Sequence, residues 1–207
     1  MKKILLIFAG FFIINAAVAQ FHLGPKVGYI TSSLSIDQSA ISTSFNESFL
    51  FGAFLRLGSK VYIQPEINWF TTGTVFKSVE LGSLSPIEQE ITLQNIQIPI
   101  NIGLRLMNLK VFSLRIAGGI AANIIVDKQI ESNETGNYTA PIKETDINDY
   151  TYGFQVGGGF DIAMFTFDVQ YFGGIRSLID YVEIDGTNVL FDSKGEGFMV
   201  TIGWKIL

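Results

Sequence analysis

Cysteine and histidine, two residue types of catalytic and metal sites, are almost absent from this chain. It contains no cysteine and a single histidine, His22. Without cysteine there is no disulfide framework and no lipid anchor on an N-terminal cysteine, so stability must come from backbone pairing and packing. Transition-metal sites and Ser/His/Asp arrangements need such side chains in combination. We therefore expect no catalytic residue, no metal site and no cofactor, with His22 a residue of the rim.

Long apolar runs are equally scarce, and the one that is present lies at the N-terminus. Met1–Lys3 supplies two positive charges, Ile4–Ile14 an apolar core and Ala17–Ala19 a small-residue cleavage site. This is the pattern of a secretory signal, and its apolar core is short for a helix that spans a membrane in about 20 residues. We predict a signal peptide over residues 1–19 and one domain over residues 20–207 without a transmembrane helix.

The remaining apolar residues alternate with small or polar ones. From Phe198 to Ile206 every second residue is large and apolar, and the intervening ones, such as Thr201 and Lys205, are mostly polar or small. Successive side chains of a strand point to opposite faces, so this segment has one apolar and one mostly polar face. Apolar outside and polar inside is typical of a transmembrane β-barrel. The predicted strands are residues 23–36, 48–57, 61–70, 93–106, 112–123, 150–162, 165–172 and 198–206.

This reading predicts an all-β, eight-stranded, antiparallel, up-and-down transmembrane barrel. A soluble lipocalin-like carrier also has alternating strands, but its apolar face lines the inside. The predicted connections alternate between short and long, as expected if short turns face the periplasm and long loops face the outside. The short ones are Gly58–Lys60, Met107–Lys110 and Ala163–Met164, and the long ones are residues 37–47, 71–92, 127–149 and 173–196.

Charge is distributed unevenly between these parts. The net charge is −5, and the acidic excess lies in the long loops. Such loops argue against nucleic acid as a partner, because nucleic acid needs a basic surface. Acids of one loop, Glu131, Glu134, Asp146 and Asp149, leave calcium binding open beside the simpler interpretation of a solvated loop.

Inward-facing positions of the predicted strands carry charges of both signs. Most of them fall in the half of the barrel nearest the short turns. The interior of an eight-stranded barrel can be filled by side chains, and an isolated buried ion is very costly. We therefore predict a salt-bridged plug beneath a wetter vestibule lined by Asn68, Asn123 and Gln155. The predicted lumen charges are Lys26, Arg56, Glu66, Arg105, Arg115, Asp161, Asp168 and Lys205.

Four segments, in this order, resemble a known family: Lys26–Tyr29, Ile63–Trp69, Ile96–Ile102 and Tyr171–Ile175. They are similar to the PorT-like outer-membrane β-barrel family of Gram-negative bacteria, often described as porin family proteins. The resemblance covers essentially the whole mature chain. It implies an eight-stranded barrel of the small OmpA and OmpX architecture and no shared activity. The motif positions are Pro65, Glu66, Pro99, Tyr171 and Gly174.

Prolines, glycines and aromatic residues of the predicted strands lead to three expectations about local structure. Pro65 and Pro99 lie within strands and each lacks an N–H donor, so a bulge or a missing ladder bond is expected near each. Gly157–Gly159 lacks the residues of a phosphate-binding loop and is expected to allow curvature or close packing inside the barrel. Aromatic residues near strand ends or on the outward face predict interfacial girdles. They are Tyr29, Trp69, Phe112, Tyr152, Phe165, Tyr171 and Trp204.

The leading functional hypothesis is a non-enzymatic outer-membrane scaffold with a plugged lumen, whose acidic loops contact the exterior. A narrow channel for small solutes is the alternative, although eight strands usually leave little room. Expected partners are outer-membrane lipids and, during biogenesis, periplasmic chaperones and the barrel-assembly machinery. By family resemblance, Trp204 fits the terminal aromatic that this machinery reads, whereas Ile206 stands where the family has Phe. No extracellular ligand can be named.

Overall fold

A computed structural model describes residues 21–35, 41–42, 46–78, 88–132, 144–184 and 187–207. The predicted signal peptide lies outside the described residues. Among those that are described, no helix has the length and apolar character needed to cross a membrane. The strands are β1 (Phe21–Ser35), β2 (Ile41–Ser42), β3 (Asn46–Gly58), β4 (Val61–Ser78), β5 (Glu88–Asn108), β6 (Phe112–Ser132), β7 (Tyr150–Ile162), β8 (Phe165–Gly174), β9 (Ile179–Ile184) and β10 (Thr187–Trp204).

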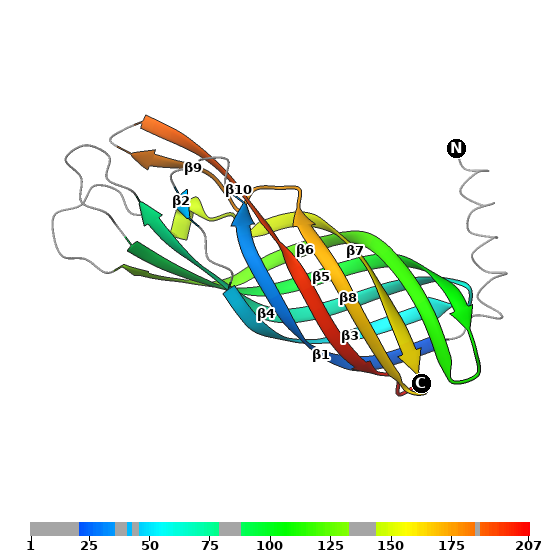
Figure 1. Cartoon of the computed structure of the whole chain (residues 1–207). Coiled ribbons are helices and arrows are strands. Elements are labelled where there is room, and N and C mark those ends of the chain that lie inside the picture. Colours follow the sequence, from blue (N-terminus) through cyan, green and yellow to red (C-terminus); the bar gives the residue numbers. More distant parts are fainter. Residues whose placement is uncertain (1–20, 36–40, 43–45, 79–87, 133–143, 185–186) are drawn as a thin grey trace, which may run out of the picture.

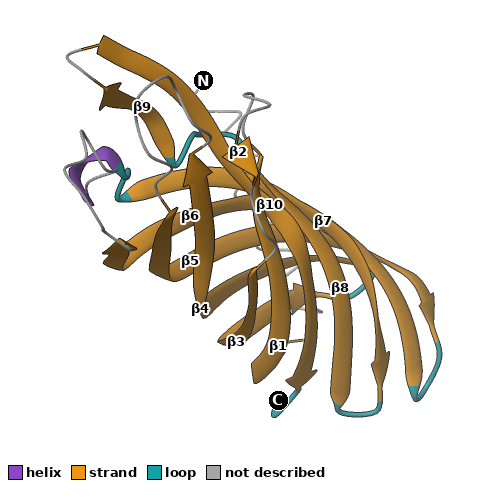
Figure 2. Ribbon diagram, turned by 60° about the vertical axis from the view of Figure 1, so that its left-hand side comes forward, coloured by secondary structure: helices purple, strands orange, loops and turns teal. Residues whose placement is uncertain are grey.

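Eight of these strands close into a barrel. β1, β3, β4, β5, β6, β7, β8 and β10 pair in that order, and β10 pairs back with β1. All these pairings are antiparallel, with residues such as Tyr29 and Val200 opposite each other at the closure. The short turns gather at one end of the tilted barrel and the strand extensions at the other (Figures 1 and 2). The predicted eight-stranded antiparallel barrel is therefore confirmed.

The predicted long loops are wrong in their extent. β4 continues to Ser78 and β5 begins at Glu88, so their hairpin extends well into the predicted loop 71–92. β6 likewise runs to Ser132. Within the predicted loop 173–196, β9 pairs with the first part of β10 and forms a hairpin beyond the barrel wall. Polar residues such as threonine can continue the pairing of two strands once their hairpin has formed. The apolar alternation of a membrane strand is therefore not required in these extensions.

The outer wall is apolar. Phe51, Ile102, Ile120 and Trp69 are 59–68% exposed, and the outward aromatic Phe49 is 72% exposed. Aromatic rings pack side by side in two zones of this wall. Near the loop end, the Tyr171 ring lies 5.4 Å from that of Phe198 and 6.0 Å from that of Phe154. Near the turn end, the rings of Phe112, Phe160 and Phe167 are stacked at 6.2 and 4.9 Å. Two of the predicted girdle residues, Tyr171 and Phe112, belong to these zones.

The two strand prolines interrupt the ladders without shifting them. Between β3 and β4 the pairing stops after Phe54 and Glu66 and resumes at Leu57 and Ile63, on either side of Pro65. Between β4 and β5 the pairing is interrupted between Pro65 and Asn68, next to Pro99, and resumes in the same register. The expected interruption of the ladder is therefore found next to both prolines. The register shifts lie elsewhere, at Gln94/Asn95 and Arg105/Met107 of β5.

The glycine run of β7 makes room for lumen side chains. A Cβ atom on Gly159 would overlap the Asp168 carboxylate and the carbonyl of Phe167, and one on Gly157 would overlap Gln170. Gly158 lies between them, and the nearest atom to its Cβ would be the Arg115 carbonyl oxygen at 3.4 Å. The run therefore serves close packing inside the barrel, one of the two roles expected from the sequence.

This difference between neighbouring glycines gives a matched pair of variants. We expect Gly159→Ala to lower the free energy of unfolding by about 1–3 kcal/mol, because the new methyl group displaces the Asp168 carboxylate. Gly158→Ala should change it by less than about 0.5 kcal/mol. Urea unfolding of the refolded proteins, followed by tryptophan fluorescence, measures both. Equal losses for the two variants would contradict this assignment.

Candidate functional site

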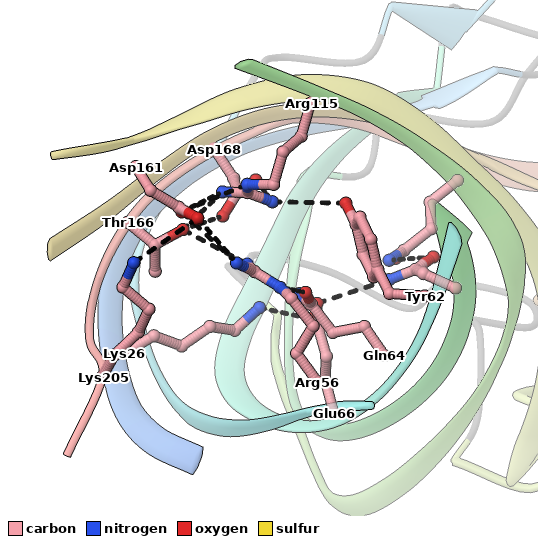
Figure 3. Close-up of polar contacts among 12 residues, drawn as sticks. Lys26, Arg56, Tyr62, Gln64, Glu66, Arg115, Asp161, Thr166, Asp168 and Lys205 are labelled. Carbon is pink, nitrogen blue, oxygen red and sulfur yellow. Dashed lines mark hydrogen bonds and ion pairs between the residues drawn. The ribbon is translucent and has the colours of Figure 1, made fainter. Parts of the chain in front are cut away.

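The candidate site is the charged cluster inside the barrel, defined as the eight predicted lumen charges. Its first centre is Glu66 on β4. The Glu66 carboxylate accepts hydrogen bonds from Lys26 Nζ, Gln64 Nε2 (2.6 Å) and Asn101 Nδ2 (3.3 Å). Asn68 Nδ2 lies 3.5 Å from the same group. Glu66 and Lys26 are each only 5% exposed, so this ion pair is buried (Figure 3).

The second centre is Asp161 on β7, which three cations approach. Its oxygens lie 3.1 Å from Arg56 Nη1, 3.0 Å from Arg115 Nη2 and 3.5 Å from Lys205 Nζ. These cations come from β3, β6 and the segment that follows β10. The Asp161 carboxylate therefore joins strands that are distant in the sequence, as Figure 3 shows.

Arg56 illustrates how a fully buried guanidinium is accommodated. It is 0% exposed. Its Nε donates to Gln64 Oε1 at 2.5 Å, and its Nη2 donates to Thr166 Oγ1 at 3.3 Å. The guanidinium carbon lies 5.1 Å from the centre of the Tyr62 ring and 5.5 Å from that of Phe54. Charge pairing, hydrogen bonds and aromatic faces together offset the cost of removing this ion from water.

Arg115 connects Asp161 to the third carboxylate, Asp168. Arg115 Nη1 lies 3.0 Å from Asp168 Oδ1 and 3.3 Å from the Tyr62 hydroxyl, and its Nη2 donates to Thr166. Thr166 in turn donates to Asp168 Oδ2 at 3.3 Å. Each of the three lumen carboxylates therefore lies within ion-pair distance of a cation, as the sequence predicted.

Arg105 lies near the turn end, three residues before the end of β5 at Asn108. It is buried, and it stands directly opposite Arg115 in the β5–β6 ladder. Lys205 is partly buried beside it at the same end. The structure thus brings all eight predicted charges into one lumen, with the cations in excess of the carboxylates.

Apolar side chains occupy part of the space in which the sequence predicts a wetter vestibule. Ile30, Leu50, Phe70 and Met199 form a buried apolar cluster, 0–5% exposed, with Phe172 packed against it. On β1, β3, β4 and β10 this cluster lies on the loop side of the charges. Asn68 and Gln155, which were expected to line a wet space, are themselves 0% and 1% exposed. Inward positions near the loop end are apolar on four strands, and their side chains pack against one another.

A cavity of ≈ 80 Å³ remains at the loop end. Phe70, Ile91, Leu93 and Phe172 line much of it, together with polar side chains such as Asn123. A second cavity, of ≈ 240 Å³, lies at the turn end. Members of the two clusters line these spaces, Phe70 the first and Arg105, Asp161 and Lys205 the second.

The other predicted sites are placed as follows. His22 lies at the turn-end rim, where Nδ1 donates to the Leu207 carbonyl at 3.1 Å, and it lines the turn-end cavity. Asp149 pairs with Lys128 of β6 at 2.6 Å instead of standing alone in a loop. Glu134 lies outside the described residues. Within the part of the chain that the structure describes, no three His, Cys, Asp or Glu side chains are grouped closely enough to hold a metal.

Sequence reasoning missed two members of the network. Thr166 is 2% exposed and contacts Arg56, Arg115 and Asp168. Tyr62 is 1% exposed and contacts both buried arginines, Arg56 and Arg115. The available signal was the period of two, because Thr166 precedes Asp168 by two residues and so shares its face.

The family-motif positions fall into an inner and an outer group. Glu66 is one of the two main centres of the charged cluster, and Pro65 and Pro99 flank it at the ladder interruptions. Tyr171 faces outward, where its hydroxyl donates to Glu196 at 2.8 Å. Gly174 ends β8 opposite Gly153, and a Cβ there would meet the Gly195 backbone at 3.2 Å.

One family model and several solved structures are similar to this chain. No curated protein matches the sequence. Similar solved structures include Ail, the attachment invasion locus protein of Yersinia pestis, at 13% identity and a TM-score of 0.46, covering 90% of this chain and 99% of that one. OprG, an outer membrane protein from Pseudomonas aeruginosa, is 14% identical with a TM-score of 0.45, covering 90% and 95%. The model of the outer membrane protein beta-barrel domain matches residues 15–180, and the chain belongs to this family.

Proposed function

We propose that this outer-membrane barrel is a closed, non-enzymatic scaffold whose contacts with other molecules are made at its loop end. The observation that carries the proposal is the burial of polar and charged side chains inside the barrel. Arg56 and Asn68 are 0% exposed and Arg115 is 2% exposed, although all three project into the barrel interior. A path for solutes would require these groups to leave their partners.

The orientation of the barrel in the outer membrane is inferred from the short and long connections between its strands. We propose that the short turns and both chain ends face the periplasm and that the strand extensions face the exterior. In this arrangement residues 1–19 act as a cleaved signal, the apolar wall contacts outer-membrane lipids, and chaperones and the assembly machinery act during biogenesis. The four motif segments support assignment as a PorT-like, porin-family member.

The loop end has an ordered base for such contacts. Lys128 Nζ donates to the carbonyl oxygen of Ile147 at 2.6 Å and pairs with Asp149. Ile147 and Ile179 are buried and form a bridge between the segment before β7 and β9. The short helix η1 (Glu144–Asp146) is held beside them, and two of its three residues are acidic. The loop end therefore presents acidic groups on a fixed support.

Ion conductance of the refolded protein in a planar bilayer tests this proposal. A closed scaffold gives no reproducible current steps, provided that folding is verified in the same preparation. Reproducible steps would favour the alternative, a narrow channel. The observation in favour of that alternative is the pair of cavities, ≈ 80 and ≈ 240 Å³, which approach the charged cluster from its two ends.

A further inference from the structure

The loop-end cavity has mostly apolar walls that are shielded from solvent. Four of its lining residues are only 1–5% exposed: Phe70, Ile91, Leu93 and Ala121. Arg176, which follows the end of β8, also lines the cavity and is exposed, so the space opens at the loop end. Among the described lining residues, Arg176 alone is charged. A neutral, largely apolar molecule therefore matches the interior of this cavity better than an ion does.

A glycine of β10 leaves part of this space unfilled. Gly195 lines the cavity, and a Cβ atom built on it would have no atom of the described residues within 4 Å, apart from its own chain neighbours. Gly153 and Gly174 line the cavity too, but a Cβ atom on either would meet backbone atoms, at 2.6 and 3.2 Å. Close packing therefore explains the absence of a side chain at Gly153 and Gly174. At Gly195 the absence of a side chain leaves open volume.

Asn123 of β6 supplies an independent indication of a ligand. Its Nδ2 donates a hydrogen bond to Thr151 Oγ1 at 3.3 Å. Its Oδ1 is buried and has no hydrogen-bond partner in the part of the chain that the structure describes, and Asn123 lines the cavity. A buried acceptor without a donor is unfavourable, because it has lost water without gaining a partner. A hydroxyl group inside the cavity would donate to this oxygen.

We propose that the loop-end cavity binds a small neutral molecule that has an apolar body and one hydroxyl group. The apolar body packs against side chains such as Ile91 and Leu93, and the hydroxyl group donates to Asn123 Oδ1. An apolar cavity of about 150 Å³ holds benzene, so a cavity of ≈ 80 Å³ suits roughly three or four carbon atoms. Short aliphatic alcohols are the ligand class with this size and chemistry. The inference goes beyond the proposed scaffold role and does not depend on whether the lumen conducts.

Titration with n-butanol, followed by NMR of labelled methyl groups, tests the proposal on the full refolded protein in nanodiscs. The methyl groups of Ile91, Leu93 and Ala121 report on the cavity. The methyl groups of Ile120, which is 68% exposed on the outer wall, report on alcohol that dissolves in the lipid. We expect saturable shifts for the cavity methyl groups and a shift that does not saturate for Ile120. An absence of saturable shifts at the cavity would overturn the proposal.

Diethyl ether is the matched probe, because it has the same atoms as n-butanol but no hydrogen-bond donor. We expect the wild type to bind the ether at least about 5-fold more weakly than the alcohol. Asn123→Leu removes the acceptor, so it should weaken n-butanol binding by about 5-fold or more. The same variant should leave ether binding within about 2-fold, since apolar contacts remain. Equal affinity of the wild type for the two probes would overturn the proposal.

Gly195→Val tests the location of the site by filling the open volume. We expect it to weaken the binding of both probes by at least about 10-fold, because packed side chains leave no room for a ligand. Gly158→Val is the control. Gly158 lies on β7, does not line the cavity, and its Cβ would have the Arg115 carbonyl oxygen at 3.4 Å as its nearest neighbour. Its affinity for n-butanol should stay within about 2-fold of the wild type, since the cavity is unchanged. A folded Gly195→Val with wild-type affinity would overturn the proposal.

Discussion

Replacing Asp161 by Asn is expected to lower the free energy of unfolding by about 3–5 kcal/mol. The change leaves the shape of the side chain almost intact but removes the negative charge that Arg56, Arg115 and Lys205 share. Arg56 would then be a buried cation without a carboxylate partner in the contacts described above. Urea unfolding of the refolded barrel, followed by the fluorescence of Trp69 and Trp204, measures the effect.

The same substitution at Asp149 is the control. Asp149 also pairs with a lysine, Lys128, but its side chain is 66% exposed. Pairs of this kind contribute about 0–1 kcal/mol, because water and salt screen them. If Asp161→Asn cost no more than Asp149→Asn, the charged cluster would not stabilise the barrel as described.

The second large effect is expected in the apolar cluster. Phe70→Ala should cost about 3–5 kcal/mol, because it removes a buried ring between Leu50, Ile30 and Met199 and leaves a cavity. Phe70 also lines the loop-end cavity, so the variant enlarges that space toward the charges. Thermal unfolding, detected by the mobility shift of folded barrels in gels, measures the loss.

Phe70→Leu is the companion variant, because it keeps an apolar side chain of similar size. Its cost should be at most about 1.5 kcal/mol. A loss for Phe70→Ala no larger than that for Phe70→Leu would mean that the cluster is loosely packed. The loop half of the lumen would then be closer to the wet vestibule that the sequence suggested.

The alternation of side chains predicted the barrel and the inward charges, because a period of two fixes which face each residue occupies. It could not predict the partners of each charge. Arg56 and Asp161 are 105 residues apart and meet only because the barrel closes with one particular strand order and register. The pairing of Arg105 with Arg115 across a ladder likewise depends on the register shift beside them.

Two other features of the structure could not be predicted from the sequence, each for a different reason. The extensions of β4, β5 and β6 carry polar residues on both faces, so the apolar pattern ends before the strands do. The apolar cluster occupies single inward positions on four strands, such as Ile30 and Met199. A single apolar residue on a mostly polar strand face does not by itself predict a cluster. The four residues come together only when the barrel closes.

Single-channel conductance in a planar bilayer tests the central claim most directly, which is that the charged and apolar clusters close the lumen. The comparison is between the wild type and the double variant Phe70→Ala/Asp161→Asn, each checked for folding. We predict no steps for the wild type and measurable steps for the double variant, because both closing layers are then disrupted. Steps of the same size in both proteins would contradict the account, since ions would then pass along a route that these clusters do not control.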